Sequence, residues 1–258
     1  MTASAGTWQR AGRPALARLT ATELRLFLRE RGAVFWGVAF PVVLLVIFGS
    51  IPGFHRPSRA LGGLTYLQAY VPVLMALVLA LLGLSVLPAF LAGYRERGVL
   101  RRLATTPVGP GRLLAAQLAV QAGVALVTMA VILAVARLAY GVTLPRQAAG
   151  FLVALALAVL ALLAMGLVVA AVAPGTRAAS AIGTILFFPM MFFAGLWVPI
   201  AAMPSGLREA AHLTPLGAAV QALQDAALGH WPHLLQLGVL AGYAIVFSVA
   251  AVTWFRWE

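Results

Sequence analysis

The chain has 258 residues, of which 63% are hydrophobic and only 9% charged, with a mean hydropathy of +1.00. Since a soluble domain carries about 25% charged residues, this composition excludes a water-soluble globular protein and predicts an all-α integral membrane protein. The net charge is +12, every basic residue is an arginine, and cysteine is absent, so disulfides and cysteine-based catalytic or metal sites are excluded. The arginines flank apolar stretches, which indicates membrane topology rather than nucleic-acid binding.

Residues 1–32 are expected to form a cytoplasmic segment that contains an amphipathic helix over residues 14–31. Leucine and phenylalanine recur there at near-helical spacing. The basic face of this helix consists of Arg18, Arg25, Arg29 and Arg31. Such a helix would lie in the headgroup layer of the membrane. A solvated basic tail is the alternative interpretation.

Residues 33–258 are expected to form one six-span domain, because crossing the hydrocarbon core takes about 20 apolar residues. The predicted spans are 33–51, 64–92, 113–136, 148–173, 181–198 and 233–255. Thirteen of the eighteen arginines fall on one side of this arrangement, in the N-terminal segment, the 93–112 loop and two further positions. The positive-inside bias therefore places both termini and the 93–112 loop in the cytoplasm.

Two polar segments interrupt the apolar pattern. In the 93–112 loop, a group of charges precedes Val99, Leu100 and Leu103 on one helical face, and Thr106-Pro107 ends the helix. This pattern predicts a short amphipathic helix that docks another protein or, alternatively, anionic lipid. The 199–232 segment holds apolar stretches too short to span, which indicates a re-entrant or outer helical hairpin.

Two blocks of sequence carry a resemblance to a known family. The stretch from Arg95 to Leu103, followed by Thr106-Pro107-Val108, resembles the cytoplasmic signature of the ABC-2 type permeases, the membrane subunits of ATP-driven exporters. The stretch from Phe188 to Pro199, with Met203-Pro204 and Leu213-Thr214-Pro215-Leu216, resembles their second conserved block. The order of the two blocks, the six-span topology and the length agree with that family over essentially the whole chain. Within the family, the chain looks most like the actinobacterial drug and antibiotic resistance permeases.

The resemblance implies a non-enzymatic subunit of an exporter for a lipophilic, drug-like compound in the bacterial inner membrane. Without lysine the chain cannot carry a phosphate-binding loop, so ATP and Mg²⁺ are expected on a separate ATPase, present in two copies. No cofactor is expected on this chain, which would pair with a second permease chain as a homodimer or heterodimer. The coupling residues carried over from the family are Arg95, Glu96, Arg97, Gly98, Leu100, Arg101, Arg102, Thr106 and Pro107.

Within this assignment, Glu96 is expected to pair with a basic group on the ATPase or with an arginine of the N-terminal helix. In relatives the second and fifth spans line the cavity, for which the candidates here are Tyr66, Gln68, Tyr70, Met75, Phe187, Phe188, Met191, Phe192 and Phe193. Ordinary packing is the alternative role for each of them. The candidates for an outer gate are Gly195, Pro199, Met203, Pro204 and Pro215.

Other polar residues suggest less specific roles. Gln117 and Gln121 are expected to bond across helices. Asp225 is expected at the surface of a short outer helix, and the four histidines are expected in outer loops without a nearby carboxylate partner. Two other functions compete with drug export, namely export of a lipid-linked glycan or lipid and a membrane-embedded enzyme. An enzyme would require polar residues that converge inside the spans, and the spans contain almost none.

Overall fold

The computed structural model describes residues 6–58, 61, 63–104 and 110–254, and these residues contain helices and no β-strand. Six helical stretches are long and apolar enough to cross a membrane, as predicted. They are Arg31–Gly49, Tyr66–Glu96, Gly111–Tyr140, Ala148–Val172, Thr176–Phe193 and Leu234–Trp254. The chain is therefore an all-α, multi-pass integral membrane protein.

The first two spans each contain a π-helical segment next to a proline. The first span consists of α2 (Arg31–Val34), η1 (Phe35–Ala39) and α3 (Phe40–Gly49), and Pro41 follows η1. The second consists of α4 (Tyr66–Ala80), η4 (Leu81–Val86) and α5 (Leu87–Glu96), and Pro88 follows η4. Proline lacks an N–H group and its ring clashes with the carbonyl four residues earlier, so a wider turn before each proline lets the helix continue.

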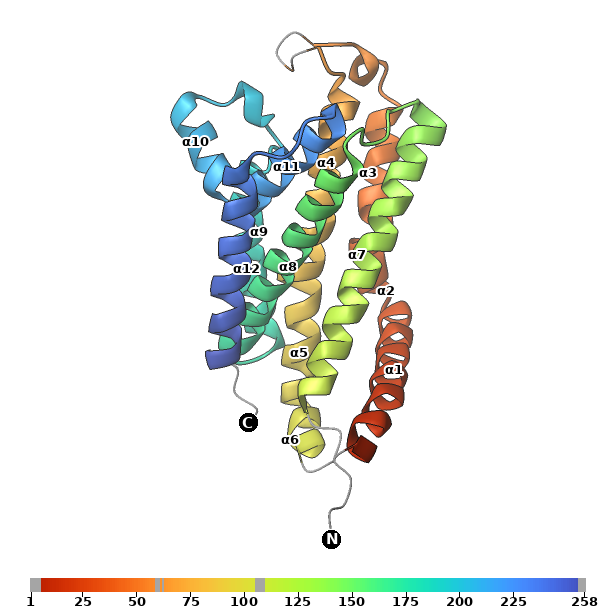
Figure 1. Cartoon of the computed structure of the whole chain (residues 1–258), viewed down its shortest axis with the longest axis vertical. Helices are drawn as coiled ribbons and strands as arrows, with labels where there is room; N and C mark the ends of the chain where they lie inside the picture. The colour runs from red at the N-terminus through yellow and green to blue at the C-terminus, as the bar shows by residue number, and fades with distance from the viewer. Residues whose placement is uncertain (1–5, 59–60, 62, 105–109, 255–258) are drawn as a thin grey trace.

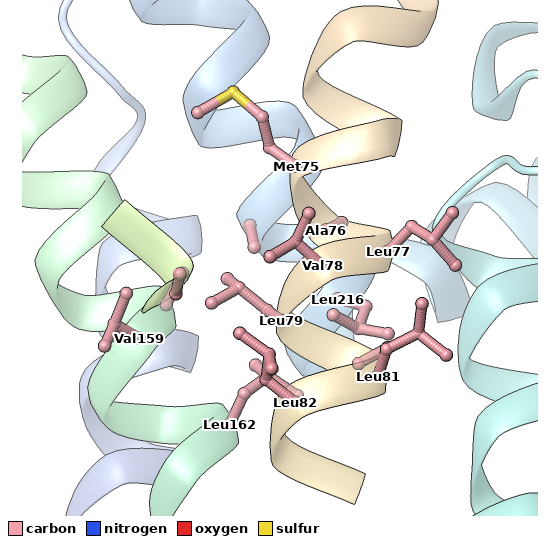
Figure 2. Packing of buried hydrophobic residues seen from close by; sticks show 14 of the residues in the cluster. Met75, Ala76, Leu77, Val78, Leu79, Leu81, Leu82, Val159, Leu162 and Leu216 are labelled. Carbon is pink, nitrogen blue, oxygen red and sulfur yellow. The ribbon is translucent and has the colours of Figure 1, made fainter. Parts of the chain in front are cut away.

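The second span lies at the centre of the bundle, and most of its side chains are buried. Figure 2 shows its leucines among side chains of α8 (Ala148–Val172) and Leu216 of α11 (Pro215–Leu228). A Cβ atom added at Gly166 of α8 would lie 2.1 Å from the carbonyl oxygen of Gly83 in η4. Glycine is therefore required at this crossing, as is common where membrane helices pack backbone to backbone.

The remaining elements surround this centre (Figure 1). They are α1 (Gly6–Arg29), η2 (Pro52–His55), α6 (Val99–Ala104), α7 (Pro110–Tyr140), α9 (Thr176–Phe193), η5 (Ile200–Ala202), α10 (Ser205–Leu213) and α12 (Leu234–Trp254). The first helix packs along α7, and α12 packs along α8. Figure 1 shows α1 and α6 at one end of the bundle and α10 and α11 at the other.

The predicted hairpin before the last span is formed by α10 and α11, which are both too short to cross a membrane. Thr214 ends α10 and caps α11, because its hydroxyl oxygen accepts a hydrogen bond from the Gly217 amide at 3.2 Å. Pro215 occupies the first turn of α11, where its missing N–H group costs nothing. Most of α11 is buried against α4, α8 and α12.

Candidate functional site

The end of α5 holds the turn that connects α8 to α9. The Glu96 carboxylate accepts a hydrogen bond from the Thr176 amide at 2.8 Å and two contacts from the Thr176 hydroxyl at 3.2 and 3.1 Å. Thr176 is the first residue of α9, and the preceding Gly175 has no side chain with which to cap that helix. Glu96 therefore caps α9 from a distant part of the chain, where a negative charge also complements the helix dipole.

Arg95 acts on the same turn from the other side. Its guanidinium donates a hydrogen bond to the carbonyl of Ala173, the residue that follows α8. Free carbonyls at a helix C-terminus are favourable partners for a cation. Consecutive residues of the predicted coupling loop thus bind the end of one span and the start of the next. Within the described residues, the Glu96 carboxylate has Thr176 as its partner rather than an arginine of the N-terminal helix.

The rest of the predicted coupling loop folds against its own helix. The Arg97 side chain turns back, with Nε 3.0 Å from the Gly93 carbonyl oxygen and the guanidinium 5.7 Å from the centre of the Tyr94 ring. Gly98 has a φ of +66°, and this left-handed conformation, which favours glycine, ends α5 before α6 begins. Leu100 is buried, whereas Arg101 and Arg102 are exposed. The predicted residues Thr106 and Pro107 lie outside the described part of the chain.

A buried carboxylate joins α1 to the bundle. Glu23 is only 5% exposed, and its Oε2 atom accepts hydrogen bonds from the Tyr94 hydroxyl at 2.5 Å and from the Gln117 amide at 2.8 Å. Burial raises the pKa of Glu23 above its usual value, and the bond from Tyr94 opposes that shift. The expectation that Gln117 bonds across helices is confirmed. Gln121 is also buried, but neither atom of its amide has a partner among the described residues.

Sequence reasoning missed Glu23, although a signal was present. Glu23 is the single acidic residue of α1 and lies four residues before Phe27, on the same helical face. Phe27 is buried, while the predicted basic residues Arg18, Arg25, Arg29 and Arg31 are all exposed. A lone carboxylate on the apolar face of a basic helix therefore marks the side that packs against the protein.

An elongated groove of about 930 Å³ runs between the first span, the second span and α9. Its apolar walls are formed by Trp36, Phe40, Leu44, Leu77, Leu81, Phe90, Phe187, Phe188, Leu196 and Trp197. At one end it is lined by polar groups, namely Glu30, Glu96, Arg97 and Thr176. The Glu96–Thr176 contact thus forms part of the groove as well as the cap of α9.

Two of the nine predicted path residues, Phe187 and Phe188, line this groove. Gln68 instead completes a capping box with Thr65 at the start of α4, and the Tyr70 hydroxyl donates to the Leu196 carbonyl at 3.2 Å. Those that do not line the groove are Tyr66, Gln68, Tyr70, Met75, Met191, Phe192 and Phe193. The contribution of the first span was missed, although aromatic residues recur there at Phe35, Trp36 and Phe40.

The predicted outer-gate residues shape the chain between α9 and α11. Gly195 has a φ of +88° and turns the chain directly after α9. Pro199 and Pro204 immediately precede η5 and α10, and Met203 is buried between these two elements. These residues and Pro215 therefore fix the turns of the hairpin, and none of them lines the groove.

The expectation that the histidines lack a nearby carboxylate is wrong for three of the four, namely His212, His230 and His233. The Asp225 side chain is half-buried, and burial raises its pKa, while the charges of His233, His230 and His212 and the His233 backbone amide oppose that shift. The histidines converge because α10, α11 and the start of α12 meet at this end of the bundle. Among the described residues there is no group of three or more histidine or acidic side chains placed to hold a metal ion.

Comparison with protein families gives a match. The family model described as ABC-2 type transporter matches residues 14–228, which run from within α1 to the end of α11. This range includes the coupling loop, the groove and the hairpin. A search of curated proteins finds no match.

Proposed function

Because the family match covers most of the chain, the chain belongs to the ABC-2 type transporter family, and we propose that it is the permease subunit of an ATP-driven exporter. As a multi-pass member of this family, it is a membrane component of a transporter rather than the ATPase. The proposed cargo is a lipophilic, drug-like compound that moves outward across the bacterial inner membrane. In this orientation α1 and α6 face the cytoplasm, and α10 and α11 face outward.

The groove carries the proposal for the cargo. Its volume of about 930 Å³ lies at the upper end of the range for drug-sized ligands, typically 300–1,000 Å³. Six aromatic side chains are part of its apolar wall, and charged groups line one end. Such a surface suits a molecule with a large apolar body and a small polar end, because the aromatic rings supply apolar contact and the charged groups orient the ligand.

The groove also supports a pair of permease chains. One wall is formed by α9, a span with few buried residues. Trp36, Phe188 and Trp197 line the groove and are each about half exposed. We propose that a second permease chain, identical or related, covers this side and encloses the path.

The coupling step follows from the contacts at the end of α5. We propose that two ATPase subunits, which hold ATP and Mg²⁺, dock on α6 and on the exposed arginines Arg101 and Arg102. A displacement of this loop would reach α9 directly, because Glu96 caps α9 and Arg95 holds the residue that follows α8. Since α9 is also a wall of the groove, closure of the ATPases would change the shape of the path.

Transport in inverted membrane vesicles tests this function. The permease and its ATPase are co-expressed, and ATP-dependent uptake of a lipophilic fluorescent dye is measured for the native chain, for Phe188→Ala and for Ile185→Ala. Ile185 is exposed on the same helix and does not line the groove, so it is the matched control. We expect slower uptake with Phe188→Ala and native uptake with Ile185→Ala.

Two other outcomes would change the conclusion. If no ATPase co-purifies with the native chain and ATP drives no uptake, the proposed exporter is wrong. If the vesicles translocate a lipid-linked glycan in an ATP-dependent manner but take up no dye, the cargo is a glycolipid. A membrane-embedded enzyme is the least supported alternative, because the family match is to a transporter.

A further inference from the structure

A second cavity lies at the end of the bundle opposite α1, where Figure 1 shows α10 and α11. Its volume is about 750 Å³, and side chains from η5, α10, α11 and the start of α12 line it. The groove between α3 and α9 shares none of its lining residues. The two cavities are therefore separate.

Two carboxylates line this cavity. The whole chain has six acidic residues and a net charge of +12, yet two of the six, Glu209 and Asp225, line the cavity. One arginine, Arg208, is also in the wall, and its guanidinium donates to the Met203 carbonyl at 3.4 Å. Two histidines, His212 and His233, complete the titratable lining, and a neutral imidazole offers one acceptor nitrogen.

Buried amides in the wall have hydrogen-bonding atoms without partners. Gln221 and Gln236 are 9% and 5% exposed, and the Gln236 amide donates to the Gln221 oxygen at 3.1 Å. This bond leaves Gln221 Nε2 and Gln236 Oε1 without a partner among the described residues, together with Asp225 Oδ2. Buried polar groups in proteins are normally paired. The wall therefore has one unused donor, on Gln221, and two unused acceptors, one on Gln236 and one on the Asp225 carboxylate.

We propose that this cavity is a binding site for an organic ammonium group, the protonated amine of a lipophilic molecule. An alkylammonium ion carries one positive charge and up to three N–H donors, which match the carboxylates of Glu209 and Asp225 and the unused amide oxygen of Gln236. Ile200, Leu213 and Leu235 form apolar parts of the same wall and would contact the carbon skeleton. The site involves neither the ATPase nor the groove, so it goes beyond the proposed export function.

Binding to the full chain in nanodiscs tests the site, with radiolabelled octylamine as the probe and empty nanodiscs as the background. Octanol has the same chain without the charge, and octyltrimethylammonium has the charge without an N–H donor. We expect saturable octylamine binding at pH 7, weaker binding of octyltrimethylammonium and no saturable binding of octanol. Asp225→Asn is expected to raise the Kd for octylamine about tenfold, since it removes a charge-assisted hydrogen bond.

Two further variants keep the test decisive. Glu209→Gln changes an exposed side chain of the cavity wall, and it is also expected to raise the Kd. Glu30→Gln removes a carboxylate from the groove at the other end of the bundle, so this variant detects any octylamine that binds in the groove instead of in this cavity. The proposal is overturned if octanol binds as well as octylamine, if both cavity variants bind normally, or if Glu30→Gln alone abolishes binding. Absence of saturable octylamine binding would also overturn it.

Discussion

Replacing Glu96 by alanine is expected to loosen the first turn of α9 without unfolding the bundle. The substitution removes the acceptor of the Thr176 amide, at 2.8 Å, and both contacts of the Thr176 hydroxyl. No nearby side chain replaces the cap, because Gly175 precedes the helix. The helix would therefore begin with unsatisfied N–H groups.

The size of the effect follows from the kind of hydrogen bond that the substitution removes. A hydrogen bond to a charged group contributes about 1.5–3 kcal/mol, and removal of a helix N-cap costs about 0.5–2 kcal/mol. Glu96 is exposed, so solvent competes for the carboxylate and the low end of the overlap between these two ranges applies. A destabilisation of about 1.5 kcal/mol corresponds to an approximately tenfold larger open population of this turn.

Hydrogen–deuterium exchange of the chain in nanodiscs measures that population. Glu96→Ala is expected to speed exchange of the Thr176 amide about tenfold, and Glu96→Gln, which retains an oxygen acceptor, is expected to fall between it and the native chain. Glu209→Ala removes an exposed carboxylate at the opposite end and serves as the control. If exchange at Thr176 is the same in Glu96→Ala and the native chain, the contact does not stabilise α9 and the proposed coupling route loses its basis.

Three further predictions concern stability. Burial raises the pKa of Glu23 above 4.5, so the folded chain holds the carboxyl proton more tightly than the unfolded chain does. The stability of the fold should therefore decrease as the pH rises from 4.5 through the raised pKa. Melting curves at pH 5 and pH 7 should show this decrease for the native chain but not for Glu23→Gln. Gly166→Ala should decrease the stability by about 1–3 kcal/mol and lower the Tm, because the added Cβ overpacks against Gly83. Gly242→Ala is the control and should leave the Tm unchanged, because a Cβ at Gly242 meets no atom within 4 Å. Gly98→Ala should decrease the stability by about 1–2 kcal/mol, because Gly98 has a φ of +66°. The expected result is faster amide exchange in α6, and unchanged exchange would contradict the prediction.

The amino-acid sequence by itself determined that the chain is a six-span, all-α membrane protein. A long apolar run predicts a membrane-spanning helix, because backbone N–H and C=O groups in lipid must be hydrogen-bonded within the segment. The exact boundaries of the spans depended on the local backbone conformation. The fifth span was expected over 181–198, but α9 covers Thr176–Phe193, since Gly195 turns the chain while the apolar run continues.

The tertiary structure alone decided which polar residues meet. Glu96 and Thr176 are 80 residues apart, and Glu23 lies 71 residues from Tyr94. Likewise, Asp225 faces histidines only because α10, α11 and α12 converge. The spacing of apolar residues indicates which face of each helix is buried. Which other helix packs against that face depends on contacts between segments that are distant in the sequence. The sequence therefore determined the number and kind of spans, and packing determined the partners of their few charged residues.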